Sequence, residues 1–167
     1  MRIILALTIN IVLFALTFLF MSHTYIALLV GISLFVWFFY FLWKRQNLVL
    51  RRVEDKIQGE TVIISPEHIM FRAVESSGYS QTSGMGYIAL TESFLYFELV
   101  LLDLVITVPT NRLLDAEFVS RLKGVSPGRK MLRIVYINEN GDHDSIAINV
   151  KEMEQWKNTI LKVCENV

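Results

Sequence analysis

The sequence is poor in the residues that bind metals or form disulfides. Its single cysteine, Cys164, excludes an internal disulfide and fits a reducing compartment. The three histidines, at positions 23, 68 and 143, are scattered, and no HExxH motif or paired Cys/His spacing is present. The Asn and Asp side chains of residues 138–144 lack the EF-hand spacing and are typical of a turn. We therefore expect no bound metal and no cofactor.

The sequence also lacks the motifs of common catalytic sites. The serines of residues 75–85 are not set in a GxSxG pattern, and nothing in the sequence places a base beside them. No P-loop or dinucleotide-binding fingerprint is present. We name no catalytic residue and expect that the protein is not an enzyme. A pocket with convergent polar groups and perturbed titrating residues would overturn this expectation.

Charged side chains are missing from two long apolar runs near the N-terminus. Ile3–Met21 and Tyr25–Trp43 are each 19 residues long and contain no Asp, Glu, Lys or Arg. As a helix each run would measure about 28 Å, close to the hydrocarbon thickness of a bilayer of ~30 Å. Because only three residues separate the runs, we predict a two-helix transmembrane hairpin with spans at 3–21 and 25–43. The alternative is a cleaved signal peptide followed by one span, although no A-x-A-like site follows the first run.

Basic side chains indicate the orientation of this hairpin. Arg2 precedes the first run, and Lys44, Arg45, Arg51 and Arg52 follow the second, whereas the connecting turn has neither Lys nor Arg. By the positive-inside rule the turn faces outward and both termini are cytoplasmic. We therefore predict a multi-pass protein of the inner (cell) membrane, with the lipid bilayer as a partner.

The sequence of residues 44–59 predicts a basic amphipathic juxtamembrane linker. Val49, Val53 and Ile57 recur at every fourth position, which is typical of a helix with one apolar face that continues from the second span. Gly59 is a plausible end for this helix. Its basic groups would attract anionic lipid by ~1 kcal/mol per charge near the surface. The simpler interpretation is a topology signal followed by a helical stalk.

The soluble part, residues 60–167, is acidic and rich in short strands. It carries fourteen acidic and ten basic side chains, which argues against nucleic-acid binding. β-branched and aromatic residues gather in short runs separated by turn residues. Asn140-Gly141 predicts a type I′ hairpin turn, and residues 61–65 an extended segment that precedes the first strand. The expected strands are 68–75, 86–91, 94–100, 104–109, 114–120, 131–137 and 143–148.

A C-terminal amphipathic helix follows the last expected strand. Asn149 is a candidate helix cap with Glu152 three residues later, and Trp156 and Ile160 lie on the apolar face. Seven short strands and one amphipathic helix predict a small antiparallel barrel with the helix over one open end.

Several of these segments resemble a known family. Residues 86–98 (GYIALTESFLYFE) resemble the second and third strands of PH-like and GRAM-like domains, and residues 71–73 (FRA) resemble their first-strand signature. Together with the apolar hairpin, residues 62–165 make the chain similar to small bacterial membrane proteins that carry a PH-like domain. The resemblance implies an α+β domain, a seven-stranded antiparallel split barrel capped by a C-terminal helix. It also implies a non-catalytic binding or scaffold module.

The resemblance leaves the partner open. Phosphoinositide-binding PH domains place Lys and Arg in the first loop, and residues 75–85 contain neither, so phosphoinositide binding is not expected. We expect a protein partner or self-association at the inner membrane face. The alternative is sensing or handling of anionic lipid by the linker and by the basic loop around residues 124–128. The candidate membrane or anion contacts are Lys44, Arg45, Arg51, Arg52, Arg121, Lys123, Arg129 and Lys130.

Overall fold

The computed structural model describes residues 9–17, 24–77, 83–102, 104–122 and 129–165. The chain divides into two compact units, Met1–Lys44 and Arg45–Val167. Each unit is described below by itself. Helix α2 (Thr24–Ile57) begins in the first unit and ends in the second.

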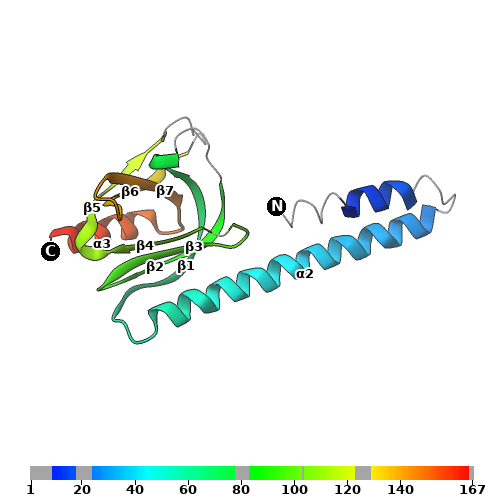
Figure 1. The fold of residues 1–167 in the computed structure, drawn as a ribbon, viewed down its shortest axis with the longest axis horizontal. Coiled ribbons are helices and arrows are strands. Elements are labelled where there is room, and N and C mark those ends of the chain that lie inside the picture. Colours follow the sequence, from blue (N-terminus) through cyan, green and yellow to red (C-terminus); the bar gives the residue numbers. More distant parts are fainter. Residues whose placement is uncertain (1–8, 18–23, 78–82, 103, 123–128, 166–167) are drawn as a thin grey trace. The chain divides into compact units, whose positions relative to one another are not determined.

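The described residues of the N-terminal unit are helical and mostly apolar. Residues 9–17 are helical, and the first part of α2 follows them (Figure 1). Within the described residues, one segment, Leu28–Ile57, is long and apolar enough to cross a membrane. The prediction of an N-terminal apolar helix is thus confirmed, whereas most of the first expected span, 3–21, lies outside the described residues. In this unit a side-chain carbon added at Gly31 would lie 3.1 Å from Cε2 of Phe14.

The second unit contains one antiparallel sheet of seven strands. Its order is β4-β3-β2-β1-β7-β6-β5, so two meanders meet where β1 pairs with β7. Short 3₁₀ turns, η1 (Glu75–Ser77) and η2 (Thr110–Arg112), follow β1 and β4, and helix α3 (Met153–Glu165) ends the described chain. The strands are β1 (Val62–Val74), β2 (Gly84–Thr91), β3 (Phe94–Leu99), β4 (Val105–Pro109), β5 (Leu113–Val119), β6 (Met131–Ile137) and β7 (His143–Asn149). The seven-stranded antiparallel sheet and the C-terminal helix were both predicted correctly.

Strand β1 is longer than the sequence indicated, because it begins at Val62 rather than at residue 68. Its pairing with β2 is shifted between Val62 and Glu67, and its pairing with β7 is shifted between Phe71 and Ala73. Such irregularities let a strand bend and accommodate a proline, which lacks the N–H of a regular ladder. Pro66 lies in the first irregular stretch. The long bent strand belongs to both meanders and joins them.

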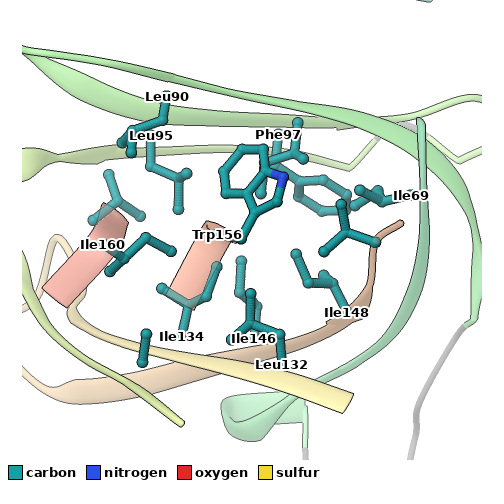
Figure 2. Packing of buried hydrophobic residues seen from close by; sticks show 14 of the residues in the cluster. Ile69, Leu90, Leu95, Phe97, Leu132, Ile134, Ile146, Ile148, Trp156 and Ile160 are labelled. Carbon is teal, nitrogen blue, oxygen red and sulfur yellow. The ribbon is translucent and has the colours of Figure 1, made fainter. Parts of the chain in front are cut away.

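The core lies between the two meanders and the apolar face of α3, which contributes the buried Trp156 and Ile160 (Figure 1). Figure 2 shows Trp156 of α3 with Leu90 and Leu95 on one side and Ile134 and Ile146 on the other. The indole Nε1 of Trp156 donates a hydrogen bond of 2.6 Å to Oε2 of Glu67. The other oxygen of this carboxylate accepts a bond from the backbone N–H of residue 151. Glu67 of β1 therefore binds both the backbone just before α3 and Trp156 in the first turn of α3.

Asn149 does not cap the C-terminal helix, so that prediction is wrong. Asn149 is the last residue of β7, and α3 begins four residues later at Met153. Its side-chain oxygen accepts a bond from Arg72 Nε at 2.8 Å, and its amide donates to the carbonyl of Lys130 at 2.7 Å. The amide side chain therefore bridges the backbone and side chains of neighbouring strands instead of satisfying a helix N–H.

The hairpin predicted at Asn140-Gly141 is present, but its turn type differs. The amide of Gly141 donates to the carbonyl of Asn138, so Glu139 and Asn140 are the central residues of the turn. Gly141 follows with φ of 86°. Asn138 Oδ1 accepts bonds from the backbone amides of residues 140 and 142. This is a three-residue loop with a glycine in the left-handed region, which the Asn138 side chain stabilises.

Candidate functional site

The C-terminal part of α2 packs on the outer face of the sheet. In β3 the side chains alternate, so that Leu95, Phe97 and Leu99 enter the main core. The β3 side chain between the first two of these, Tyr96, faces the opposite side of the sheet. There it packs in a second apolar cluster with the apolar stripe of α2, which consists of Val49, Val53 and Ile57. This cluster contains Val49, Val53, Ile57, Ala89, Tyr96 and Val100. The apolar stripe that the sequence showed in residues 44–59 therefore faces the sheet.

A buried carboxylate lies at the centre of this interface. The side chain of Glu98 is only 4% exposed, and its Oε1 is 2.8 Å from Nη2 of Arg52, which is 54% exposed. Its Oε2 accepts a hydrogen bond of 2.9 Å from the hydroxyl of Tyr96. Burial, followed by the hydrogen bond to Glu98 and its negative charge, raises the pKa of Tyr96 to about 12, and the Arg52 guanidinium acts in the opposite direction. Both oxygens of Glu98 thus have a partner, as a buried charge requires.

A second arginine of α2 binds the end of the same strand. Nε of Arg45 donates a hydrogen bond of 3.0 Å to the carbonyl oxygen of Val100, directly after β3. Arg45 and Arg52 are seven positions apart, about two helical turns, and so lie on one face of α2. Two arginines and three apolar side chains therefore fix residues 45–57 to the sheet.

The remaining predicted contacts are not part of this interface in the described structure. Lys44 and Arg51 are exposed on α2, and Arg121 and Arg129 are exposed on the sheet unit. Nζ of Lys130 lies 5.6 Å from the ring centroid of Phe118, which Lys157 also approaches at 5.1 Å. Lys123 lies outside the described residues. From the sequence, all eight basic residues were candidate membrane or anion contacts. In the structure, Arg45 and Arg52 bind the sheet instead.

A second polar cluster, unnoticed in the sequence, surrounds Arg133 of β6. Its Nη1 and Nη2 contact Glu117 at 2.7 Å and Glu75 at 2.8 Å, and its Nε donates to Oγ of Ser145 at 3.0 Å. Burial acts to lower the pKa of the Arg133 guanidinium, but the bonds to Glu117 and Glu75 outweigh it, so the pKa is raised. Ser145 also donates to Glu75. The cluster ties η1 to β5, β6 and β7, and its acids are occupied by these contacts.

The other ionisable and polar side chains of the described residues can be compared with the Glu98 interface. Among them, no group of three or more His, Cys, Asp or Glu side chains is placed to hold a metal ion. The rings of His68 and Tyr87 form a T-shaped pair, with ring centroids 5.6 Å apart. In the same residues every buried side-chain nitrogen or oxygen has a hydrogen-bond partner. The interface between residues 45–57 of α2 and the sheet, around the buried Glu98, is the candidate functional site.

Replacing Arg52 with alanine is expected to destabilise the docking of α2 by about 1–3 kcal/mol. The loss arises because the buried Glu98 carboxylate keeps only its bond from Tyr96. Arg52 is more than half exposed, so the effect stays below that of breaking a fully buried ion pair. Hydrogen exchange of the amides of residues 49–57 in the full chain measures it. Arg51→Ala, next to it and exposed, is the matched control, and equal effects of the two variants would contradict the assignment.

Comparisons with known proteins do not assign a family. No family model matches the chain, and no curated protein matches it. Among solved structures, the C-terminal domain of an unknown protein from Leishmania infantum is similar, with 16% identity and a TM-score of 0.48 over 71% of this chain and 96% of that one. A chain of the 8S snRNP assembly intermediate is similar with 9% identity and a TM-score of 0.42, over 62% of this chain and 80% of that one.

Proposed function

We propose that this protein is a membrane-anchored, non-catalytic PH-like module that binds a protein partner, or a second copy of itself, at the inner face of the cell membrane. The observation that carries this proposal is the division of α2 into two parts with different surroundings. Residues 28–43 expose large apolar side chains such as Leu29, Phe35 and Trp43. Residues 45–57 bury their apolar stripe on the sheet.

Exposure of so many large apolar side chains on one helix is unfavourable in water, because apolar surface costs roughly 25 cal/mol per Å². A bilayer removes that cost, and the run from residue 25 to residue 43 has the length that a bilayer needs. The docked part of α2 then continues directly into the sheet unit. The helix is therefore both the proposed anchor and the proposed support of the binding module.

Two further features support the hairpin and its orientation. The ring of Phe14 lies close to Gly31, and close approach at a small residue is typical of helices that pack within a membrane. Lys44 and Arg45 directly follow the second apolar run, and the expected outer turn has no Lys or Arg. The proposal therefore includes two spans, 3–21 and 25–43, and cytoplasmic termini.

The PH-like assignment is supported by the order of the elements. Two antiparallel meanders joined through a long first strand, followed by a C-terminal helix with one face in the core, agree with the split barrel that the resemblance implies. In such a module the binding function belongs to the outer surface, because apolar side chains of the strands together with Trp156 and Ile160 of α3 fill the interior. This arrangement favours recognition of a partner surface over catalysis.

The topology makes a direct prediction. A cytoplasm-active reporter fused after Val167 is expected to be active, and the same reporter inserted after His23, in the proposed outer turn, is expected to be inactive. An enzyme that is active only outside the cytoplasm should give the reverse pattern at both positions. Activity of the second reporter after Val167 would contradict cytoplasmic termini. Activity of the same reporter type at both positions would contradict the hairpin.

Recognition of anionic lipid is less well supported than partner binding. Arg45 and Arg52, two of the eight basic residues on which it depends, bind the sheet. Lys130 contacts Phe118, and the lysine at 123 lies outside the described residues. Lipid sensing by the remaining basic side chains stays a prediction from sequence.

A further inference from the structure

Exposed charges differ in sign between the two ends of strand β6. One end of this strand meets the β5–β6 connection, and the other end meets the β6–β7 hairpin of residues 138–142. Because the seven residues of β6 are extended, the two ends lie about 20 Å apart. Both ends belong to the Arg45–Val167 unit, so their separation is set within one compact unit.

Four cationic side chains gather at the β5–β6 end, and we call them the basic end. Arg121, Arg129 and Lys130 are exposed beside the connection, and Lys157 of α3 is partly exposed. Nζ of Lys130 and Nζ of Lys157 lie 5.6 Å and 5.1 Å from the ring centroid of Phe118 on β5, so α3 brings its cation to the same place. No ion pair within the described residues includes any of the four.

Three exposed carboxylates gather at the opposite end, and we call them the acidic end. Glu139 and Asp142 belong to the β6–β7 hairpin, and Glu92 belongs to the turn between β2 and β3. The short η2 turn connects these two segments, because Oγ1 of Thr110 donates to the carbonyl of Glu92 at 2.8 Å and an arginine of η2 donates to the first carbonyl of the hairpin at 3.4 Å. In the part of the chain that the structure describes, these three carboxylates form no ion pair.

Each end also contains charges of the opposite sign, but they are fewer. Near the basic end, Glu152 and Glu154 at the start of α3 are accompanied by Lys151. Near the acidic end, Lys56 lies over an aromatic ring, and Arg112 binds a backbone carbonyl rather than a carboxylate. Each end therefore keeps an excess of its own charge.

A second copy of this chain presents a complementary surface to either end. Opposite charges on two surfaces speed their encounter and select the correct pairing. An anionic membrane would match the basic end alone and would leave the acidic end without a partner. A contact between two different ends does not close on itself, so it can continue from copy to copy as a ring or a chain.

We propose that the sheet units of neighbouring copies associate end to end, with the basic end of one copy on the acidic end of the next. This inference rests on the proposed function, because it chooses a second copy as the binding partner and names the two surfaces that meet. Single exposed ion pairs contribute little, so the association depends on several pairs at once and weakens in salt.

Copurification of two differently tagged copies of the full chain tests this association. The tags follow Val167, and the copies are mixed in a mild non-ionic detergent at low ionic strength. Two triple variants reverse one end each: Arg121→Glu, Arg129→Glu and Lys130→Glu at the basic end, and Glu92→Lys, Glu139→Lys and Asp142→Lys at the acidic end. All six positions are exposed, and the apolar runs are unchanged in both variants.

We expect each reversed variant to copurify with itself about tenfold less than the unsubstituted chain does, because repulsion between like charges replaces attraction. Mixing the two variants should restore copurification, because their ends are complementary again. Salt at about 1 M should abolish it. In the unsubstituted chain, a zero-length carbodiimide should join Lys130 or Lys157 to Glu139 or Asp142 of an isotope-labelled second copy, since about 20 Å separates the two ends within one copy.

Copurification of both variants at the unsubstituted level would overturn the inference and leave partner binding by another surface in place. A lack of restoration on mixing would also overturn it, because the two ends would not be each other's partners. If reversal of the basic end weakened binding to phosphatidylglycerol vesicles but left copurification unchanged, that end would belong to lipid and the inference would be wrong. Release of the unsubstituted chain from membranes by alkaline carbonate would overturn the anchor of the proposed function without affecting the end-to-end contact.

Discussion

Replacing Trp156 with alanine is expected to lower the free energy of unfolding of the Arg45–Val167 unit by about 3–5 kcal/mol. Trp156 is the largest fully buried side chain, and it contacts both meanders from within the core (Figure 2). Alanine leaves a cavity and also removes the indole N–H that donates a hydrogen bond to Glu67. Because whole domains are stable by only about 5–15 kcal/mol, this loss is enough to unfold much of the population under mild denaturation.

Urea unfolding of the full chain in a non-ionic detergent, followed by the far-ultraviolet circular dichroism of the sheet, measures this change. Trp156→Phe keeps most of the apolar volume but not the hydrogen bond, and we expect a smaller loss than for alanine. Glu67→Gln keeps an acceptor for the indole and serves as a control for charge at that position. A loss below about 1 kcal/mol for Trp156→Ala would be that of an ordinary surface position and would contradict the central place of Trp156 in the core.

Replacing Val53 with aspartate is expected to detach residues 45–57 of α2 from the sheet while the main core stays folded. Val53 is fully buried between α2 and the outer face of the sheet. A carboxylate there has no described partner, and Glu98 is already bound by Arg52 and Tyr96. Burial of an uncompensated charge costs several kcal/mol, so undocking is the less costly response.

The magnitude of this effect is limited by the docking energy itself. Each fully buried aliphatic side chain contributes about 1.5–3 kcal/mol, so Val49, Val53 and Ile57 together set an upper bound of roughly 5–9 kcal/mol. Hydrogen exchange followed by mass spectrometry should show lost protection in residues 49–57 and unchanged protection in β6 and β7. Val62→Asp, the same change at an exposed position of β1, is the control. Loss of protection throughout the sheet would show that the helix is part of the folding core rather than docked on it.

The two variants separate two of the apolar clusters of the sheet unit. Trp156 belongs to the interior cluster, whereas Val53 belongs to the cluster on the outer face, and β3 contributes alternate residues to each. If Val53→Asp leaves the interior intact, the docking of α2 can be altered without unfolding the module. Partner binding could then be measured with α2 docked and undocked in the same fold.

Local patterns in the sequence determined the strands, the terminal helix and the apolar helix. Short runs of β-branched and aromatic residues bounded by turn residues, at 86–91 and 94–100, predicted β2 and β3 to within about two residues, because this composition is visible in the local sequence. The spacing of Val49, Val53 and Ile57 predicted a helix with one apolar face, because the helical period is also visible in the local sequence. The partner of that face was not predicted, because a periodic pattern carries no information about the surface it meets.

Only the tertiary structure decided which polar side chains became parts of the fold. Arg45 and Val100 are 55 positions apart, and Arg133 and Glu75 are 58 positions apart, so their contacts depend on the register of the whole sheet. The same dependence made Asn149 a bridge between strands instead of a helix cap, and it extended β1 through Pro66. A side chain's periodicity is set by its neighbours in sequence, but its hydrogen-bond partner is set by the packing of distant strands.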